Sequence, residues 1–387
     1  MEDITQNYLQ GRFRDFYRRT EVELPPGAEA REWGFVPWTP GPDERFERHK
    51  ALLDLGDIEK YLSTNGPKHV YFSSAKYERP AARNMDSKQW KGADLVFDID
   101  AKDLPSVDTD EMGYRERLDE AHDSILRLAK LLENQFAFDD MTIVFSGGQG
   151  YHIHIRDAVV QQLDGSARGD IVNFVKGTGV DVDTMVDRFA NNDIGPSERA
   201  AFFAGGWSKI LYKDFLTYLA DIATMDEDET FEELQSYEGI GENHASGILG
   251  HATNEDGTLG LGAIGESKGL HLLFKRRAET IVREHRAVID EPVTTDVNRL
   301  IRFPGTLHGG TGFRVTRIPR DELAEFDPFV DAVADTFASF DIAVDIHEEG
   351  TYAVGDHTVT VEEGRQDVPE ELGVYLMAQG LADKLEE

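Results

Sequence analysis

The chain has 387 residues, and its content of 40% hydrophobic and 10% aromatic residues is typical of a folded globular protein rather than a disordered one. It contains no cysteine, which excludes disulfides, thiolate zinc sites, iron–sulfur clusters and cysteine nucleophiles. Acidic residues outnumber basic residues by 74 to 40, and the net charge of −34 is spread along the whole chain. Dispersed acidity of this kind keeps a protein hydrated in concentrated salt, so we expect a halophilic host.

No apolar run approaches the length of a membrane span, and the N-terminus lacks the layout of a signal peptide. We therefore expect a soluble, cytoplasmic protein with no membrane partner. The net charge by itself argues against a nucleic-acid partner. That argument carries little weight in molar salt, where local basic clusters matter more than the total charge.

In the first ninety residues, apolar spacing predicts a helix that ends before Pro25, a second helix over 44–63 and a strand over 68–75. The segment 76–91 is basic and aromatic within an otherwise acidic protein. That mixture suits a nucleic-acid or phosphate contact, and an ordinary solvated loop explains it equally well.

Strict alternation over 95–100 predicts a strand with Leu95, Phe97 and Ile99 on one face and Asp98 and Asp100 on the other. Two carboxylates about 7 Å apart on one face repel each other unless a hard cation such as Mg²⁺ or Mn²⁺ lies between them. Taken alone, the pattern is also that of an amphipathic strand whose polar face meets water.

A helix over 118–136 leads into a strand over 141–146, a glycine-rich turn and a strand over 151–155. This order favours an α/β or α+β core with its site at the strand ends. We expect a catalytic core formed by residues 1–189 and 266–387, with a small helical insertion over 190–265.

The turn between those strands reads Ser146-Gly147-Gly148-Gln149-Gly150 and leads into His152. Glycines let backbone amides approach an anion, and a hydroxyl and an imidazole add donors, so the turn predicts phosphate binding. His152 and His154 share a strand face and are alternatively zinc ligands or structural residues.

Within the expected insertion, 238–249 is similar to a helix-hairpin-helix turn, whose amides can hold a DNA phosphate. Residues 260–265 match G-x-G-x-x-G in letters only, because no strand precedes them, and we interpret them as a loop.

Asp296 follows two threonines where a loop enters a short element, and it is either a helix cap or a third carboxylate that completes Asp98 and Asp100. Arg299 and Arg302 follow closely and can neutralise triphosphate oxygens, while His308 lies in a glycine-rich loop. Beyond them, apolar spacing predicts a helix over 326–337, strands near 342–362 and a last helix from about 370.

Three of these blocks together resemble the signature blocks of the small, catalytic subunit of archaeal and eukaryotic DNA primases. They are the Asp98–Asp100 strand, the turn from Ser146 to His152, and the segment from Asp296 to His308. The resemblance covers nearly the whole chain in order. It implies a primase-type mixed α/β catalytic core with a helical insertion, and a dedicated large-subunit partner in a heterodimer.

The resemblance also implies roles for single residues. Asp98, Asp100 and Asp296 would hold catalytic Mg²⁺ or Mn²⁺ in a two-metal site. The residues that would contact the incoming nucleoside triphosphate are Ser146, Gly147, His152, Arg302 and His308.

The chain departs from the pattern at three points. Many relatives carry arginine in place of Gln149 and lysine in place of Gly310, so Arg302 or Arg314 would have to supply the missing charge. Relatives also commonly hold a structural zinc with cysteines, which this chain does not have.

These observations favour a DNA-directed nucleotidyltransferase that makes primers de novo on single-stranded DNA. The alternatives are a repair-type primase-polymerase that extends existing ends, a non-catalytic nucleic-acid-binding subunit, and a metal-dependent phosphodiesterase. The last would need a water-activating base that the sequence does not reveal.

Overall fold

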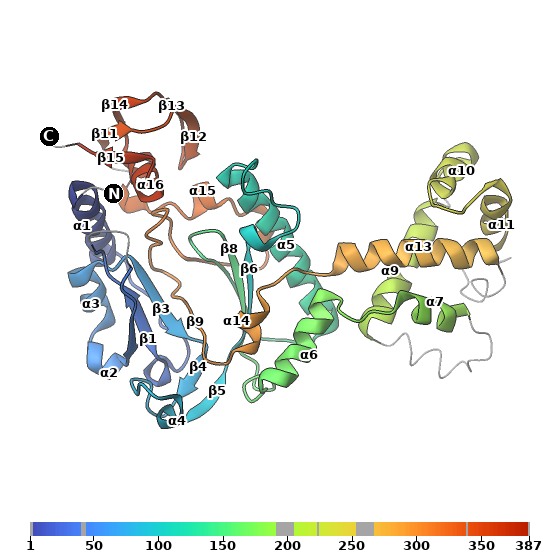
Figure 1. Ribbon diagram of the computed structural model, residues 1–387, viewed down its shortest axis with the longest axis horizontal. Coiled ribbons are helices and arrows are strands. Elements are labelled where there is room, and N and C mark those ends of the chain that lie inside the picture. The colour runs from blue at the N-terminus through green and yellow to red at the C-terminus, as the bar shows by residue number, and fades with distance from the viewer. Residues whose placement is uncertain are drawn as a thin grey trace. The chain divides into compact units, whose positions relative to one another are not determined.

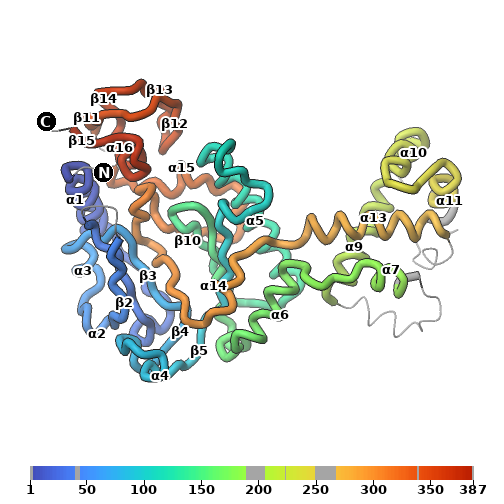
Figure 2. The backbone as a smooth tube through the Cα atoms, in the orientation of Figure 1, coloured from blue at the N-terminus to red at the C-terminus, as the bar shows by residue number. Residues whose placement is uncertain are grey.

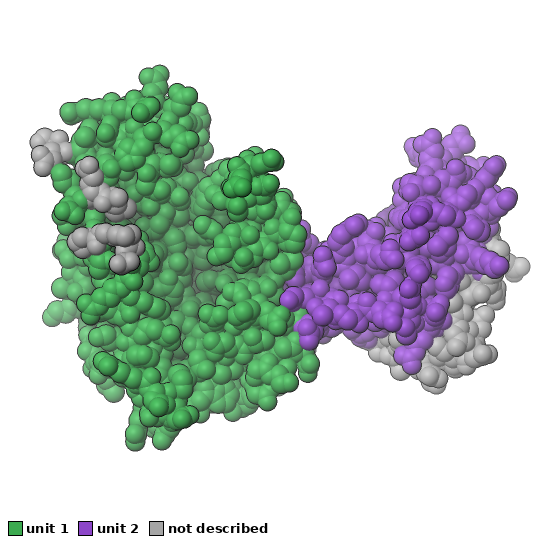
Figure 3. All heavy atoms as spheres, in the orientation of Figure 1, with its two compact units in different colours: residues 1–126, 138–172, 288–387 green, residues 127–137, 173–287 purple. Residues whose placement is uncertain are grey.

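The computed structural model describes residues 3–39, 44–190, 205–222, 224–252, 267–337 and 340–385. The chain forms two compact units (Figure 3). Unit 1 contains residues 1–126, 138–172 and 288–387, and unit 2 contains residues 127–137 and 173–287. Unit 2 thus begins before and ends after the segment 190–265 that was expected as an insertion, and it also includes residues 127–137. The mixed α/β class predicted from the sequence is confirmed.

Two four-stranded antiparallel sheets form the centre of unit 1 (Figure 1). The first has the order β2 (Glu47–Lys50), β1 (Trp33–Val36), β3 (His69–Ser73) and β9 (Leu300–Arg302). The second has the order β10 (Thr316–Ile318), β7 (Met141–Phe145), β8 (Gly150–Ile155) and β6 (Leu95–Asp100).

The register between β6 and β8 sorts their side chains onto two faces. Phe97 lies opposite Ile153, and Asp98 lies opposite His152. Cross-strand partners share a face, so one face of this sheet is apolar and the other carries the acids and histidines. Helix α5 (Tyr114–Gln135) covers the apolar face, where His122 packs 5.9 Å from the ring of Tyr151.

The polar face of the second sheet turns toward the first sheet. The ring of His154 stacks on Phe72 of β3 with centroids 6.0 Å apart, and both side chains are fully buried. The two sheets are therefore packed together beside the acid-bearing end of β6.

The remaining elements of unit 1 surround these sheets (Figures 1 and 2). The helices are α1 (Asp3–Arg19), α2 (Leu52–Leu55), α3 (Ile58–Asn65), α4 (Met85–Lys88), α14 (Glu291–Thr295), α15 (Pro328–Asp331) and α16 (Glu370–Gln379). The 3₁₀ turns are η1 (Ala28–Ala30), η2 (Ala101–Asp103), η3 (Leu323–Glu325) and η4 (Asp335–Phe337). The small sheets are β4 (Ala75–Tyr77) with β5 (Trp90–Ala93), β12 (Gly350–Val354) with β13 (His357–Val361), and β14 (Gly364–Pro369) with β11 (Asp341–Ile346) and β15 (Ala382–Lys384).

Unit 2 is helical in its described part. Helix α6 (Gly165–Lys176) begins in unit 1 and ends in unit 2. The others are α7 (Val182–Ala190), α9 (Gly206–Ile222), α10 (Glu227–Gln235), α11 (Glu242–Ala252) and α13 (Lys268–His285). The turn predicted to resemble a helix-hairpin-helix connects α10 to α11, and residues 260–265 lie outside the described residues. No helix in the described ranges is long and apolar enough to cross a bilayer.

Two helix predictions were wrong. The expected helix over 44–63 is strand β2 followed by α2 and α3, because 47–50 pairs with β1 and Asp57 caps a new helix at the Lys60 amide. The expected helix over 326–337 is divided between α15 and η4. There Asp327 accepts a hydrogen bond from the amide of Phe329 and so starts a new turn directly after Phe326.

The lysines of the basic segment 76–91 contact neighbouring side chains of the protein. Lys88 is fully buried and ion-paired with Glu32, and Lys91 is ion-paired with Glu78. Lys76 donates a hydrogen bond to Gln161 at 3.1 Å. Arg79 and Arg83 of the same segment are exposed, so the expectation of a nucleic-acid or phosphate contact at this segment stays a prediction.

A buried ion network fixes the beginning of β6. The fully buried carboxylate of Asp94 accepts a hydrogen bond from Arg31 at 2.8 Å and lies 3.4 Å from Arg156 Nε. Arg168 donates to the backbone carbonyls of Asp94 and Ala93 at 2.9 and 2.8 Å. Three arginines therefore hold the strand whose other end carries Asp98 and Asp100.

We predict that Asp94→Ala lowers the free energy of unfolding by about 3–5 kcal/mol, because it leaves the Arg31 charge buried without its partner. Urea unfolding in concentrated KCl, followed by circular dichroism, measures this loss. Asp103→Ala at an exposed position is the matched control and should stay within about 0.5 kcal/mol of the parent. Equal stability of the two variants would contradict the role of the network.

Candidate active site

A cavity of about 430 Å³ lies between the two central sheets of unit 1. Its lining comes from all the elements that meet there: Tyr71 from β3, Asp98 and Asp100 from β6, His152 from β8, and Arg302 from β9. Residues from four separate segments of the sequence thus share one cavity. The remaining lining residues are Ile99, Lys102, Ser146, Gln149, Gly150, Val293, Arg299, Leu300, Ile301 and His308.

Asp98 is the most strongly perturbed acid in this cavity. Burial, followed by the neighbouring charges of Asp100 and Asp290, raises the pKa of Asp98 to about 7. Its Oδ1 lies 3.3 Å from Nε2 of His152. Burial and the charge of Arg302 lower the pKa of His152 to about 3, so this imidazole is neutral and the contact is not an ion pair.

Asp290 is the third acid beside Asp98, and it was missed in the sequence. It caps the N-terminus of α14, and its backbone amide donates to the carbonyl oxygen of Asp98 at 2.9 Å. Its charge contributes to the raised pKa of Asp98. The sequence Asp290-Glu291-Pro292 is typical of a helix start, which is the signal that could have drawn attention to it.

The prediction that Asp296 completes the pair stays a prediction. Asp296 ends α14, a helix whose five residues span about 7.5 Å, so it lies at the far end from Asp290. Its side chain is 49% exposed and does not line the cavity. Its carboxylate accepts a hydrogen bond from the amide of Asn298 at 2.9 Å and lies 3.7 Å from Arg299 Nε.

Arg302 is held rigidly on the opposite wall. Its guanidinium donates to Nδ1 of His69 at 2.7 Å and lies over the ring of Tyr71, 5.1 Å from the centroid. Burial and Arg302 itself lower the pKa of His69 to about 2, so His69 stays neutral and can accept this hydrogen bond. The result is a fixed positive charge facing the acids.

The turn after β7 supports His308 and presents Ser146. Gly147 has a φ of +77°, and a Cβ there would lie 2.7 Å from Cβ of His308. A Cβ on Gly148 would likewise lie 2.7 Å from Nε2 of His308. Gly147 thus lies behind the cavity wall, whereas the hydroxyl of Ser146 lines the cavity and accepts from the amides of Gly148 and Gly150 at 3.3 Å.

His308 is neutral, because burial and the charge of Arg302 hold its pKa well below the usual range. Its Nδ1 accepts a hydrogen bond from the amide of Gly310 at 3.2 Å. The proton of the neutral ring therefore resides on Nε2, which makes Nε2 a donor. Gly310 serves the site through its backbone where many relatives would place a lysine.

Lys102 is a cavity cation that the sequence did not reveal. It follows Asp100 by two residues, and its Nζ lies 2.9 Å from Oδ2 of Asp100. Arg299 also lines the cavity. Arg314, considered above as a substitute charge, donates to the backbone carbonyl of Asp331 at 3.2 Å and does not line this cavity.

The zinc alternative for His152 and His154 has no support in the part of the chain that the structure describes, where no group of three or more His, Asp or Glu side chains is arranged to hold a metal ion. Carboxylate oxygens such as those of Asp98 and Asp100 are nevertheless the ligands that Mg²⁺ or Mn²⁺ prefers. The raised pKa of Asp98 reports the repulsion that a divalent cation would relieve.

We predict that Asp98→Asn stabilises the metal-free protein at pH 8 by roughly 1–3 kcal/mol, because one pKa unit corresponds to about 1.4 kcal/mol. Since the folded-state pKa of Asp98 is raised to about 7, ionisation destabilises the parent progressively as the pH rises from about 4 to above 7. The advantage of the variant should therefore vanish near pH 4.

Thermal unfolding in KCl with a chelator, at several pH values, measures this difference. Added Mn²⁺ should stabilise the parent more than the variant. A variant that is no more stable than the parent at pH 8 would show that the repulsion is absent.

The sequence of this chain is similar to sequences of known proteins. The model of the DNA primase small subunit family matches residues 97–319, a range that contains Asp98 and His308. The chain is 45% identical to the DNA primase small subunit PriS of Haloarcula marismortui, over 99% of both chains. It is 43% identical to the protein of the same name from Halorubrum lacusprofundi, over 100% of both chains.

A more distant relative extends the same result. The DNA primase small subunit PriS of Methanothrix thermoacetophila is 35% identical over 99% of this chain and 100% of its own. The resemblance inferred from the signature blocks is thereby confirmed. The matches span the full length of the relatives, and the cavity is formed by residues of those blocks. This chain therefore belongs to the DNA primase small subunit family.

Proposed function

We propose that the protein is the catalytic subunit of a DNA primase, a nucleotidyltransferase that synthesises short primers de novo on single-stranded DNA. The observation that carries the proposal is the cavity in which Asp98 and Asp100 of β6 face Arg302 of β9 across the two sheets. One wall attracts divalent cations and the other attracts phosphate oxygens. The substrates would be nucleoside triphosphates and the template strand.

Asp98, Asp100 and Asp290 would hold Mg²⁺ or Mn²⁺, which supply charge neutralisation and activation of a hydroxyl when bound. This assignment replaces Asp296 with Asp290 as the third ligand. The main-chain bond between Asp290 and Asp98 holds the third acid next to β6, so the acids are positioned before any substrate arrives.

The cationic and donor groups of the cavity would bind the triphosphate. Arg302 is fixed by His69 and Tyr71, so little side-chain freedom is lost when it binds a phosphate oxygen. Nε2 of His308 and the hydroxyl of Ser146 offer neutral donors beside it. Because His308 stays neutral, its contribution should not change across the neutral pH range.

Lys102 and Arg299 bear on the alternative of a non-catalytic subunit. That alternative was motivated by the absence of charge at Gln149 and Gly310. The cavity nevertheless contains three cationic side chains in Lys102, Arg299 and Arg302. The missing charges therefore give no reason to expect a loss of activity.

The printed names of the relatives describe a small subunit. We propose that this chain likewise functions with a primase large subunit as a heterodimer.

We predict that Asp290→Asn lowers primer synthesis on the order of 100-fold or more, because it removes a charge at the reacting centre. Asp296→Asn, which makes the same chemical change at the exposed end of α14, should keep activity within a few-fold of the parent. Synthesis of labelled products on a single-stranded template, with Mn²⁺ or Mg²⁺ in KCl, measures both. The reverse ranking of the two variants would restore Asp296 as the ligand and refute Asp290.

De novo synthesis is tested by comparing reactions with and without a pre-annealed primer. We expect labelled products in both reactions, and their loss in both for Asp98→Asn, which stays folded. Products formed only when a primer is supplied would identify the repair-type primase-polymerase instead. The absence of products from the parent in both reactions, with its large subunit present, would favour the non-catalytic alternative.

A further inference from the structure

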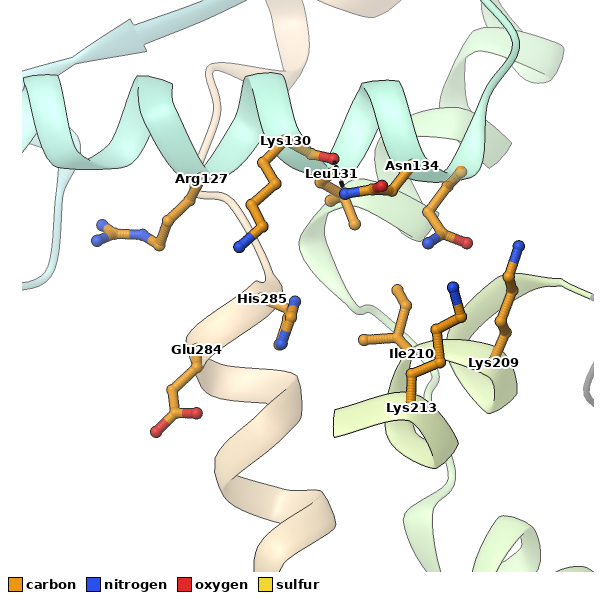
Figure 4. A pocket seen from close by; sticks show the side chains of 10 residues that line it. Arg127, Lys130, Leu131, Asn134, Lys209, Ile210, Lys213, Glu284 and His285 are labelled. Atoms are coloured by element: carbon orange, nitrogen blue, oxygen red, sulfur yellow. Dashed lines mark hydrogen bonds between the residues drawn. The ribbon is translucent and has the colours of Figure 1, made fainter. Parts of the chain in front are cut away.

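A second cavity, of about 410 Å³, lies entirely within unit 2 (Figure 4). Its walls are the C-terminal end of α5, helix α9 and the C-terminal end of α13. The floor is apolar and is formed by Leu131 and Ile210, which are 4% and 6% exposed. Above this floor the three helices direct five basic side chains to the cavity: Arg127, Lys130, Lys209, Lys213 and His285.

The acids near this cavity are already matched by cations of α13. Asp214 accepts a hydrogen bond from Arg277 at 3.2 Å, and its other oxygen lies 3.0 Å from Nε2 of His285. Glu284, which also lines the cavity, lies 3.5 Å from Arg277. Asp214 and Glu284 are thus engaged by side chains of α13.

Within the described ranges, the structure shows no ion pair for the charged groups of Arg127, Lys130, Lys209 and Lys213. This arrangement is unusual because acidic residues outnumber basic ones by 74 to 40 in this chain. Like charges gathered in one concave site repel each other, and an anion that enters the site relieves that repulsion. The cavity therefore has the electrostatics of an anion site.

The shape and chemistry of the lining favour phosphate over other anions or a nucleobase. The cations come from two facing helices, α5 and α9, so the site can neutralise more than one phosphate group at once (Figure 4). Asn134 and Gln135 add uncharged amide donors. The lining contains no Phe, Tyr or Trp on which a base could stack, and the imidazole of His285 lies 3.0 Å from Asp214.

We propose that this cavity is a second phosphate-binding site, separate from the cavity between the sheets, and that it takes consecutive phosphate groups. The source of these groups is either a single-stranded nucleic acid or a free nucleoside triphosphate. The site binds through charge and does not read base identity. The proposal does not depend on the catalytic function, because it concerns binding alone.

The first experiment measures binding of a fluorescent single-stranded oligonucleotide to the full chain over a series of KCl concentrations. The test variant is Lys130→Glu with Lys213→Glu, since both side chains are exposed and the substitutions should not disturb folding. If a strand occupies the cavity, the slope of log K against log salt should become shallower by about 1.4, or about 0.7 for each lost phosphate contact. At the lowest salt, binding should weaken about tenfold or more.

The second experiment titrates ATP into the same variants by calorimetry. If the source is a free triphosphate, the parent should bind one equivalent more than the cavity variant, while the oligonucleotide slope stays unchanged. A change in either experiment supports the site, and the experiment that changes identifies the source.

The matched control is Lys60→Glu with Lys268→Glu, which makes the same change of net charge at exposed positions outside the cavity. Circular dichroism in KCl checks that all variants are folded. Equal weakening by the control and the cavity variant would mean that only net charge matters and would overturn the proposal. Unchanged binding of both ligands by the cavity variant would overturn it as well.

Discussion

Electrostatic repulsion between carboxylates at the end of β6 is the constraint on which the site depends. The pKa of Asp98 is raised by burial and by two neighbouring acids, so the folded protein holds these groups together at a cost in stability. Other interactions in unit 1 offset this loss of stability. The register with β8 places neutral His152 opposite Asp98, and the buried arginines around Asp94 fix the other end of the strand. A divalent cation would then find its ligands already positioned.

The cationic wall of the cavity is likewise held in place by its neighbours. Arg302 lies on a three-residue strand, and it is oriented by His69 and Tyr71 of the adjacent strand. Buried histidines surround the cavity, and their pKa values are lowered, so they serve as neutral donors and acceptors. These imidazoles therefore carry no charge at neutral pH, and the charges of the site lie on its acids and its basic side chains. This division keeps the two walls complementary to a metal-bound triphosphate.

The sequence predicted the parts of this architecture that local pattern determines. Alternation located β6, and the glycine-rich turn located Ser146 and the support for His308, which the cavity brings together. Pattern could not distinguish Asp290 from Asp296, because both flank the same five-residue helix and both read as caps. Our proposal of Asp290 rests instead on a tertiary contact, the main-chain bond from Asp290 to Asp98. Lys102 was missed for a related reason. It is a single cation among acidic residues in the sequence, and only the residue at which β6 ends places it beside Asp100.

The distribution of cations explains how so acidic a chain can bind polyanions. Buried cations such as Lys88 and Arg31 are paired with buried carboxylates and contribute little to the electrostatic field outside the protein. The cavity between the sheets has Arg302, held by a histidine and a tyrosine rather than by a carboxylate, and the cavity of unit 2 has four cations without acid partners among the described residues. In concentrated salt, long-range attraction is screened within a few ångströms. In such salt, only cations that contact the phosphate inside a concave site still attract it. We therefore infer that selection for high salt places the cations that bind phosphate in cavities rather than on open surfaces.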